Sequence, residues 1–148
     1  MFLTTHTIAS LATLKISSNP IILFGLNFLL HYILDSIPHG DWGAIKGFKN
    51  LIANYAILFI CDIFFVITIY FLYTKSNPVN TINVLCAITG SILPDILWGM
   101  YYVTKLKFLK IFVNINYYAH QVFGVREEQK LYFLTQILVI FISLMIIY

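Results

Sequence analysis

The sequence predicts an all-α integral membrane protein: a polytopic bundle with about four to five transmembrane segments and one interfacial stretch. Its composition is 60% hydrophobic and 10% charged, well below the roughly 25% charged residues of soluble domains. Its mean hydropathy is +0.87. Because each spanning helix takes about 20 residues, the 148 residues predict a single membrane domain, residues 1–148, with no soluble second domain.

The apolar segments follow one another between turn clusters and prolines. The first ends at a Ser-Ser-Asn-Pro turn, and the second and third end before Pro38 and Pro78, because proline cannot continue a helix. The fourth contains Pro94, which is expected to kink it. The expected apolar segments are residues 3–16, 21–37, 51–73, 82–103 and 131–148, and residues 105–123 form the basic, aromatic interfacial stretch.

The basic residues predict the orientation and the class of partner. Of the 9 Lys and Arg residues, all but Lys15 and Lys75 lie in the stretches 38–50 and 104–130, which the positive-inside rule places in the cytoplasm. The net charge of +3 comes from scattered residues, so nucleic acid is not an expected partner and membrane lipid is. The chain starts without the basic region and cleavage site of a secretory signal. No oligomeric state is predicted.

A few ionisable side chains interrupt the apolar segments. They are His6, His31, Asp35, Asp62 and Asp95. Such groups are costly in hydrocarbon and rarely lie there without a partner or a function. Counted along their helices at 1.5 Å per residue, all of them fall in the half of the membrane nearer the basic side. We therefore expect them to converge on one interior site near the cytoplasmic face.

The spacing and chemistry of these residues favour a divalent metal. His31 and Asp35 are four residues apart, so they share one face of a helix, and His39 and Asp41 follow on the next turn. A mixture of imidazole and carboxylate suits Zn²⁺, Mn²⁺ or Fe²⁺ better than Ca²⁺. The expected metal ligands are His6, His31, Asp35, His39, Asp62 and Asp95, with Asp41 and His120 as candidate catalytic proton carriers.

Several short motifs resemble a known family. They are Thr5-His6, the stretch HYILDSIPHGD at residues 31–41, Asp62, the stretch GSILPD at residues 90–95, and His120 before the last segment. Together they resemble the small bacterial membrane-bound metal-dependent hydrolases of the YdjM-like group. The resemblance implies a divalent metal, Zn or Mn, in a protein of the bacterial inner (cytoplasmic) membrane. A remote similarity to zinc-dependent phospholipase C and related zinc nucleases implies hydrolysis of a phosphoester, for which a lipid is the expected substrate.

Two other functions stay open on the sequence alone. The first is a small cation or proton transporter whose pathway consists of Asp62, Asp95 and His31. The second is a non-catalytic membrane interaction protein that keeps the fold without the chemistry. Individual residues also have structural interpretations: Asp95 as a cap of a helix that restarts after Pro94, and Asp41 as a turn residue.

Overall fold

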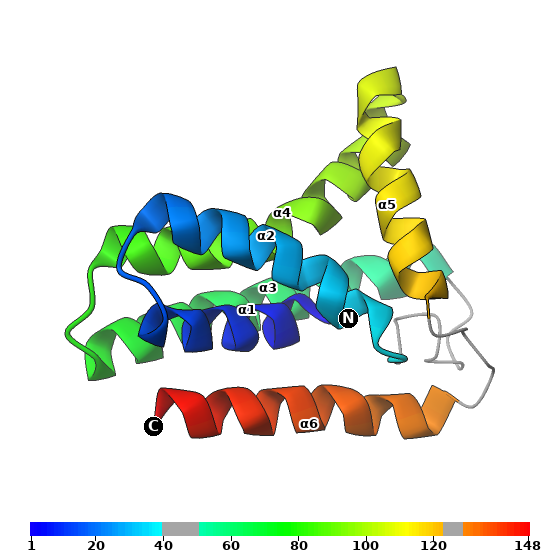
Figure 1. The fold of residues 1–148 in the computed structure, drawn as a ribbon. Helices are drawn as coiled ribbons and strands as arrows, with labels where there is room; N and C mark the ends of the chain where they lie inside the picture. Colours follow the sequence, from blue (N-terminus) through cyan, green and yellow to red (C-terminus); the bar gives the residue numbers. More distant parts are fainter. Residues whose placement is uncertain (40–50, 123–128) are drawn as a thin grey trace.

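The computed structural model describes residues 1–39, 51–122 and 129–148, and this part of the chain contains helices and no strand (Figure 1). The predicted all-α class is confirmed. The helices are α1 (Leu3–Ala12), α2 (Pro20–Ser36), α3 (Leu51–Ser76), α4 (Thr81–Thr104), α5 (Lys110–Gln121) and α6 (Gln129–Ile147), with 3-10 turns η1 (Thr13–Lys15) and η3 (Lys107–Leu109).

Two helices in the described ranges are long and apolar enough to cross a membrane. They are the Ile57–Ser76 part of α3 and all of α4, whereas α2 and the Phe133–Ile147 part of α6 are apolar but shorter. Helix α1 has 10 residues, too few to span a bilayer alone. Length and composition thus identify two spans, fewer than the four to five that the sequence predicts.

The surface of α3 supports a membrane location. Its large side chains Ile60, Phe64 and Phe71 are exposed, whereas Asp62 and Val66 are buried inside the bundle. A water-soluble helix shows the reverse pattern, with apolar residues inward and polar residues outward. Exposed apolar faces of this size mark contact with lipid or another apolar partner.

Helix α1 lies in the interior and contacts α3, α4 and α6, while α2 packs along α4 (Figure 1). Nine of the ten residues of α1 are buried, among them Thr5, His6, Thr7 and Ser10. The weakly apolar first segment of the sequence is therefore an interior helix with several buried polar side chains, which the surrounding apolar helices shield. The second half of α4 leads away from the other helices, and α5 returns toward the end of α2 (Figure 1).

Local sequence signals fix where α2 and α4 begin and end. The Asn19 side chain accepts hydrogen bonds from the first backbone N–H groups of α2 (2.9 and 3.3 Å), and Asn80 does the same for α4 (2.9 Å). Asparagine is a favoured N-cap residue. Ile37 ends α2 in an extended conformation, as expected for a residue before proline. These boundaries place His31 and Asp35 in the last turns of α2.

Candidate metal centre

The carboxylate of Asp35 is the centre of the site. Its Oδ1 atom lies 3.1 Å from Nε2 of His6 and 3.7 Å from Nε2 of His39. Its Oδ2 atom lies 3.1 Å from Nε2 of His31 and 3.6 Å from Nε2 of His120. Two imidazoles from within four residues of Asp35 and two from the distant helices α1 and α5 therefore surround one buried carboxylate.

Backbone carbonyls orient two of these imidazoles. Nδ1 of His31 lies 2.7 Å from the carbonyl oxygen of Ser91, and Nδ1 of His39 lies 2.7 Å from that of Ile37. A carbonyl can only accept, so each Nδ1 carries a proton, and in the neutral imidazole each Nε2 presents a lone pair to the site. A ring N–H held by a backbone carbonyl is the usual outer contact of a metal-binding histidine.

The packing of α2 against α4 brings His31 to Ser91. Pro94 has no N–H and so leaves the carbonyl of Gly90 without its helical donor; the next carbonyl, that of Ser91, accepts the bond from His31. Gly90 permits the approach, since a Cβ atom there would lie 2.4 Å from the carbonyl oxygen of Phe24 on α2. The Gly-Ser-Ile-Leu-Pro-Asp stretch thus brings α2 close and also supplies Asp95.

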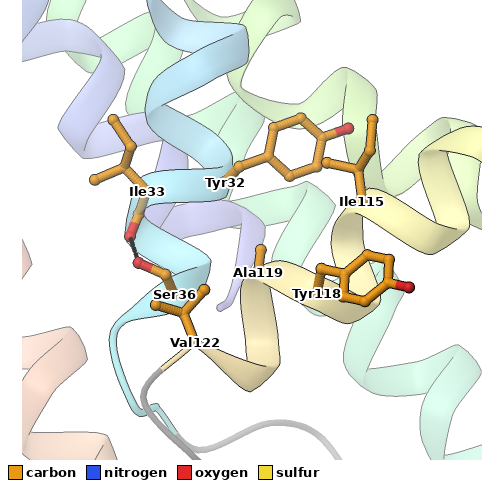
Figure 2. Close-up of a pocket in the computed structure, with 7 residues that line it drawn as sticks. All are labelled: Tyr32, Ile33, Ser36, Ile115, Tyr118, Ala119 and Val122. Atoms are coloured by element: carbon orange, nitrogen blue, oxygen red, sulfur yellow. Dashed lines mark hydrogen bonds between the residues drawn. The ribbon is translucent and has the colours of Figure 1, made fainter.

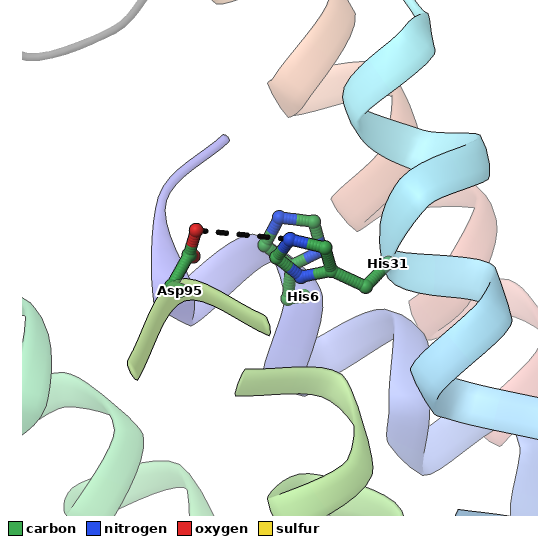
Figure 3. A group of neighbouring side chains, drawn as sticks. All are labelled: His6, His31 and Asp95. Carbon is green, nitrogen blue, oxygen red and sulfur yellow. Dashed lines mark ion pairs between the residues drawn. The ribbon is translucent and has the colours of Figure 1, made fainter. Parts of the chain in front are cut away.

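The side chains form two groups, each of which could hold a metal ion. His6, His31 and Asp95 offer ligand atoms within 4.8 Å of one another (Figure 3), and Nε2 of His31 lies 3.7 Å from Oδ1 of Asp95. The second group, with the same spacing limit, consists of Asp35, His39 and His120. We call the six residues together the histidine–aspartate cluster.

Unsatisfied atoms in the histidine–aspartate cluster fit a cation. Nε2 of His31 and Oδ2 of Asp35 are both buried and have no hydrogen-bond partner, although they lie 3.1 Å apart. When His31 is neutral, with its proton on Nδ1, two lone pairs face each other there. Because buried polar groups without partners are costly, a divalent cation, which binds both a lone pair of imidazole and a carboxylate oxygen, fits this position.

The amino group of Met1 also reaches the cluster, which sequence reasoning missed. Its nitrogen lies 2.6 Å from Oδ1 of Asp35 and 2.7 Å from Nε2 of His39, and its exposed fraction is 0%. The ammonium group partly neutralises the Asp35 carboxylate. A terminal amine has no sequence pattern that announces such a contact.

Asp62 of α3 contacts the first residues of α1. It belongs to neither group of possible metal ligands in the described part of the chain. Its carboxylate accepts hydrogen bonds from the backbone N–H groups of Leu3 (2.7 Å) and Thr4 (3.0 Å) and from the Thr4 hydroxyl. The first N–H groups of a helix need such acceptors, and their positive end favours a carboxylate. Asp62 thus caps α1 from a neighbouring helix.

The structure therefore brings five of the six predicted ligands together, namely His6, His31, Asp35, His39 and Asp95, and adds His120. The candidate proton carrier Asp41 lies outside the described residues. Gln136 is a further polar residue that sequence reasoning missed: its Oε1 accepts hydrogen bonds from the Phe2 N–H (3.0 Å) and the Thr5 hydroxyl (3.1 Å). Its isolation in the apolar last segment was the available signal.

Comparison with protein families, curated proteins and solved structures finds no match to this chain. The resemblance to the YdjM-like hydrolases therefore stays a prediction. What the described residues do establish is an all-helical protein with two helices able to cross a membrane and with two His/Asp groups able to hold a metal ion.

Proposed function

We propose that the protein is a membrane-embedded, divalent-metal-dependent hydrolase that acts on a phosphoester of lipid type. The observation that supports it most is the pair of buried, unsatisfied atoms, Nε2 of His31 and Oδ2 of Asp35. The contacts of the Asp35 carboxylate add to it, since four imidazoles lie within 3.7 Å of its oxygens. Zinc and manganese are the ions that this mixture of donors suits.

A divalent ion held in such a site acidifies a water molecule and polarises a phosphoryl oxygen. His6, His31 and Asp95 would hold one ion beside Oδ2 of Asp35. Asp35, His39 and His120 offer a second position, from which a bound ion would displace the Met1 amino group. Most of these side chains are buried, but those of Asp95 and His120 are 30% and 27% exposed. We therefore assign substrate approach to their side and proton transfer to His120, whose imidazole can both accept and donate a proton.

We further propose that α2 and α6 cross the membrane beside α3 and α4, in a bacterial inner membrane with the cluster near the cytoplasmic half. The apolar composition of α2 and α6 supports the crossing, and the concentration of Lys and Arg at one side supports the orientation. Because His31 and Asp35 lie near the C-terminal end of α2, the cluster would lie close to lipid head groups.

Metal content tests the site directly. The detergent-purified full chain is expected to contain stoichiometric zinc or manganese by elemental mass spectrometry, and His31→Ala is expected to lose it. Asn27→Ala is the matched control, because Asn27 is a buried polar residue one turn earlier on α2 that bonds Thr13 and the Leu23 carbonyl (2.8 Å each). It should retain the metal at wild-type stoichiometry.

Hydrolysis is measured on the same preparations with bis-nitrophenyl phosphate and with long-chain phosphatidylglycerol in mixed micelles. We expect activity that a chelator removes, that added Zn²⁺ or Mn²⁺ restores and that His31→Ala lacks. A metal-loaded protein without hydrolysis but with cation flux in proteoliposomes would contradict the hydrolase and favour transport. A wild-type protein without metal would contradict the metal centre itself.

A further inference from the structure

A groove opens between α2 and α5, beside the histidine–aspartate cluster. Tyr32 and Ile33 of α2 form one wall, and Ile115, Tyr118 and Val122 form the other (Figure 2). Its volume is about 390 Å³. We call it the α2–α5 groove.

The surface of the α2–α5 groove is apolar even where polar residues line it. Ala119 of α5 offers only a methyl group, and the Ser36 hydroxyl donates to the carbonyl of Ile33 at 2.6 Å, as Figure 2 shows. The hydroxyl is therefore satisfied within its own helix. The groove offers apolar contact along its length and suits a hydrocarbon occupant.

The groove and the cluster share the same stretches of chain. Tyr32 follows His31, Ser36 follows Asp35, and Ala119 precedes His120. The ring of Tyr32 also contacts the His31 ring edge-on, with centroids 5.3 Å apart. The groove and the cluster therefore occupy adjoining faces of the same two helices, α2 and α5.

One residue that lines the groove carries an unsatisfied polar atom. The Tyr32 hydroxyl is buried and has no hydrogen-bond partner. A buried tyrosine hydroxyl usually finds such a partner, so an ester or phosphate oxygen at this position would satisfy it. An apolar groove with an unsatisfied donor in its lining, on a residue whose ring contacts the cluster member His31, matches a molecule with a hydrocarbon part and an anionic part.

The size of the groove favours a single hydrocarbon chain over a helix of another protein. One turn of an α-helix, about 10 Å in diameter and 5.4 Å long, occupies roughly 400 Å³. The groove, at about 390 Å³, would take no more than one such turn, too little to hold a helix specifically. An extended acyl chain fills the same volume along its length. Lipid is also the expected neighbour of a protein with two helices able to cross a membrane.

We propose that the α2–α5 groove holds one acyl chain of a membrane phospholipid and places its phosphoester at the histidine–aspartate cluster, with the Tyr32 hydroxyl on an ester or phosphate oxygen. The inference deepens the proposed function and rests on it for the role of the head group. The acyl-chain site itself is testable without turnover.

The test uses the full chain in phosphatidylcholine nanodiscs that contain a small fraction of phosphatidic acid with a photoreactive diazirine in the half of one acyl chain nearer the ester. After irradiation, labelled residues are identified by mass spectrometry. We expect several-fold more label on groove residues such as Ile33 and Ile115 than on Phe64, an exposed residue of α3. Ile115→Trp, which fills the groove from an exposed position, should reduce the groove label several-fold.

Ile111→Trp is the matched control, because Ile111 is an exposed isoleucine one turn earlier on α5 that does not line the groove. It should leave the labelling unchanged. Uniform label over all exposed apolar residues, or an equal loss in both tryptophan variants, would overturn the acyl-chain site. His31→Ala separates the two proposals, since it should lose metal and hydrolysis yet keep the groove label.

Hydrolysis then tests the role of the groove in the reaction. Ile115→Trp should lower kcat/KM for long-chain phosphatidylglycerol several-fold and leave bis-nitrophenyl phosphate unaffected, because that substrate has no acyl chain. An equal loss for both substrates would assign Ile115 to the stability of the site and reject substrate binding in the groove.

Discussion

Asp35 and Asp62 are both buried aspartates, but their surroundings differ in chemical kind. The oxygens of Asp62 receive hydrogen bonds from backbone and hydroxyl donors at the start of α1. The oxygens of Asp35 face imidazole nitrogens and the Met1 amino group, and Oδ2 has no hydrogen-bond partner. Asp62 therefore has the environment of a structural cap, and Asp35 that of a ligand.

Asp62→Asn tests this division. The amide places an N–H₂ group where Asp62 now accepts from Leu3 or Thr4, so two donors would face each other. We expect the free energy of unfolding in detergent to fall by about 1–3 kcal/mol, measured by chemical denaturation, with metal retained. Loss of the metal at unchanged stability would instead establish Asp62 as the ligand that the sequence predicts.

The contacts of these residues also show which parts of the site the sequence can and cannot predict. The imidazoles and carboxylates could be singled out because such groups are rare in apolar segments. The partners of Asp62 could not, because every segment offers the same backbone N–H groups. The amino group of Met1 and the carbonyl of Ser91 were hidden for the same reason: neither is a side chain.

At the level of the elements, the cluster depends on how closely α2 and α4 approach. Gly90 lies against Phe24, and the next residue, Ser91, accepts the bond that orients His31. Small residues allow membrane helices to pack closely. Helix packing and ligand orientation are therefore fixed at the same point of the α2–α4 interface.

Gly90→Ala should disturb both properties together. The added Cβ would lie 2.4 Å from the Phe24 carbonyl oxygen, so the helices must separate. We expect a loss of about 1–3 kcal/mol of stability and about 10–100-fold weaker metal binding, measured by denaturation and by competition with a chelator.

Gly99→Ala is the control on the same helix, because a Cβ atom there meets nothing within 4 Å. We expect it to keep the wild-type metal affinity and to gain about 0.5–1 kcal/mol in the free energy of unfolding. Equal effects of the two substitutions would contradict this account.

The helices also show which features of the fold the sequence predicts closely and which it does not. Prolines and asparagine caps mark the ends of α2 and α4 in the sequence, so their bounds were predictable to within a few residues. The interior location of α1 was not predictable, because its moderately apolar composition fits both a membrane segment and a buried interior helix. Its burial follows from the helices around it, and no property of residues 3–12 alone distinguishes the two.

For the molecule as a whole, the cluster joins the chain near Met1 to α1, α2, α4 and α5. An ion held by His6, His31 and Asp95 would link α1, α2 and α4, and an ion held by Asp35, His39 and His120 would link α2 to α5. Since a ligand that binds the folded state stabilises it by mass action, the metal should act as an internal cross-link.

Metal removal should therefore lower the thermal stability of the wild-type protein. At a free ion concentration about 100 times the dissociation constant, the stabilisation is about 2.7 kcal/mol, which a detergent thermal-shift assay with and without chelator detects as a change in Tm. His31→Ala should show no such difference. A Tm that does not depend on metal in wild type would be inconsistent with an ion that binds only the folded bundle.

The unequal exposure within the cluster has a kinetic consequence. Asp95 and His120, the two partly exposed members, belong to consecutive helices, α4 and α5, while the buried His6 and His31 belong to α1 and α2. An arriving ion would meet the outer pair first and shed its hydration shell in stages as it moves inward. Ion exchange should then be slow at the inner imidazoles, and substitutions at the outer pair should lower the association rate of the ion as well as its equilibrium affinity.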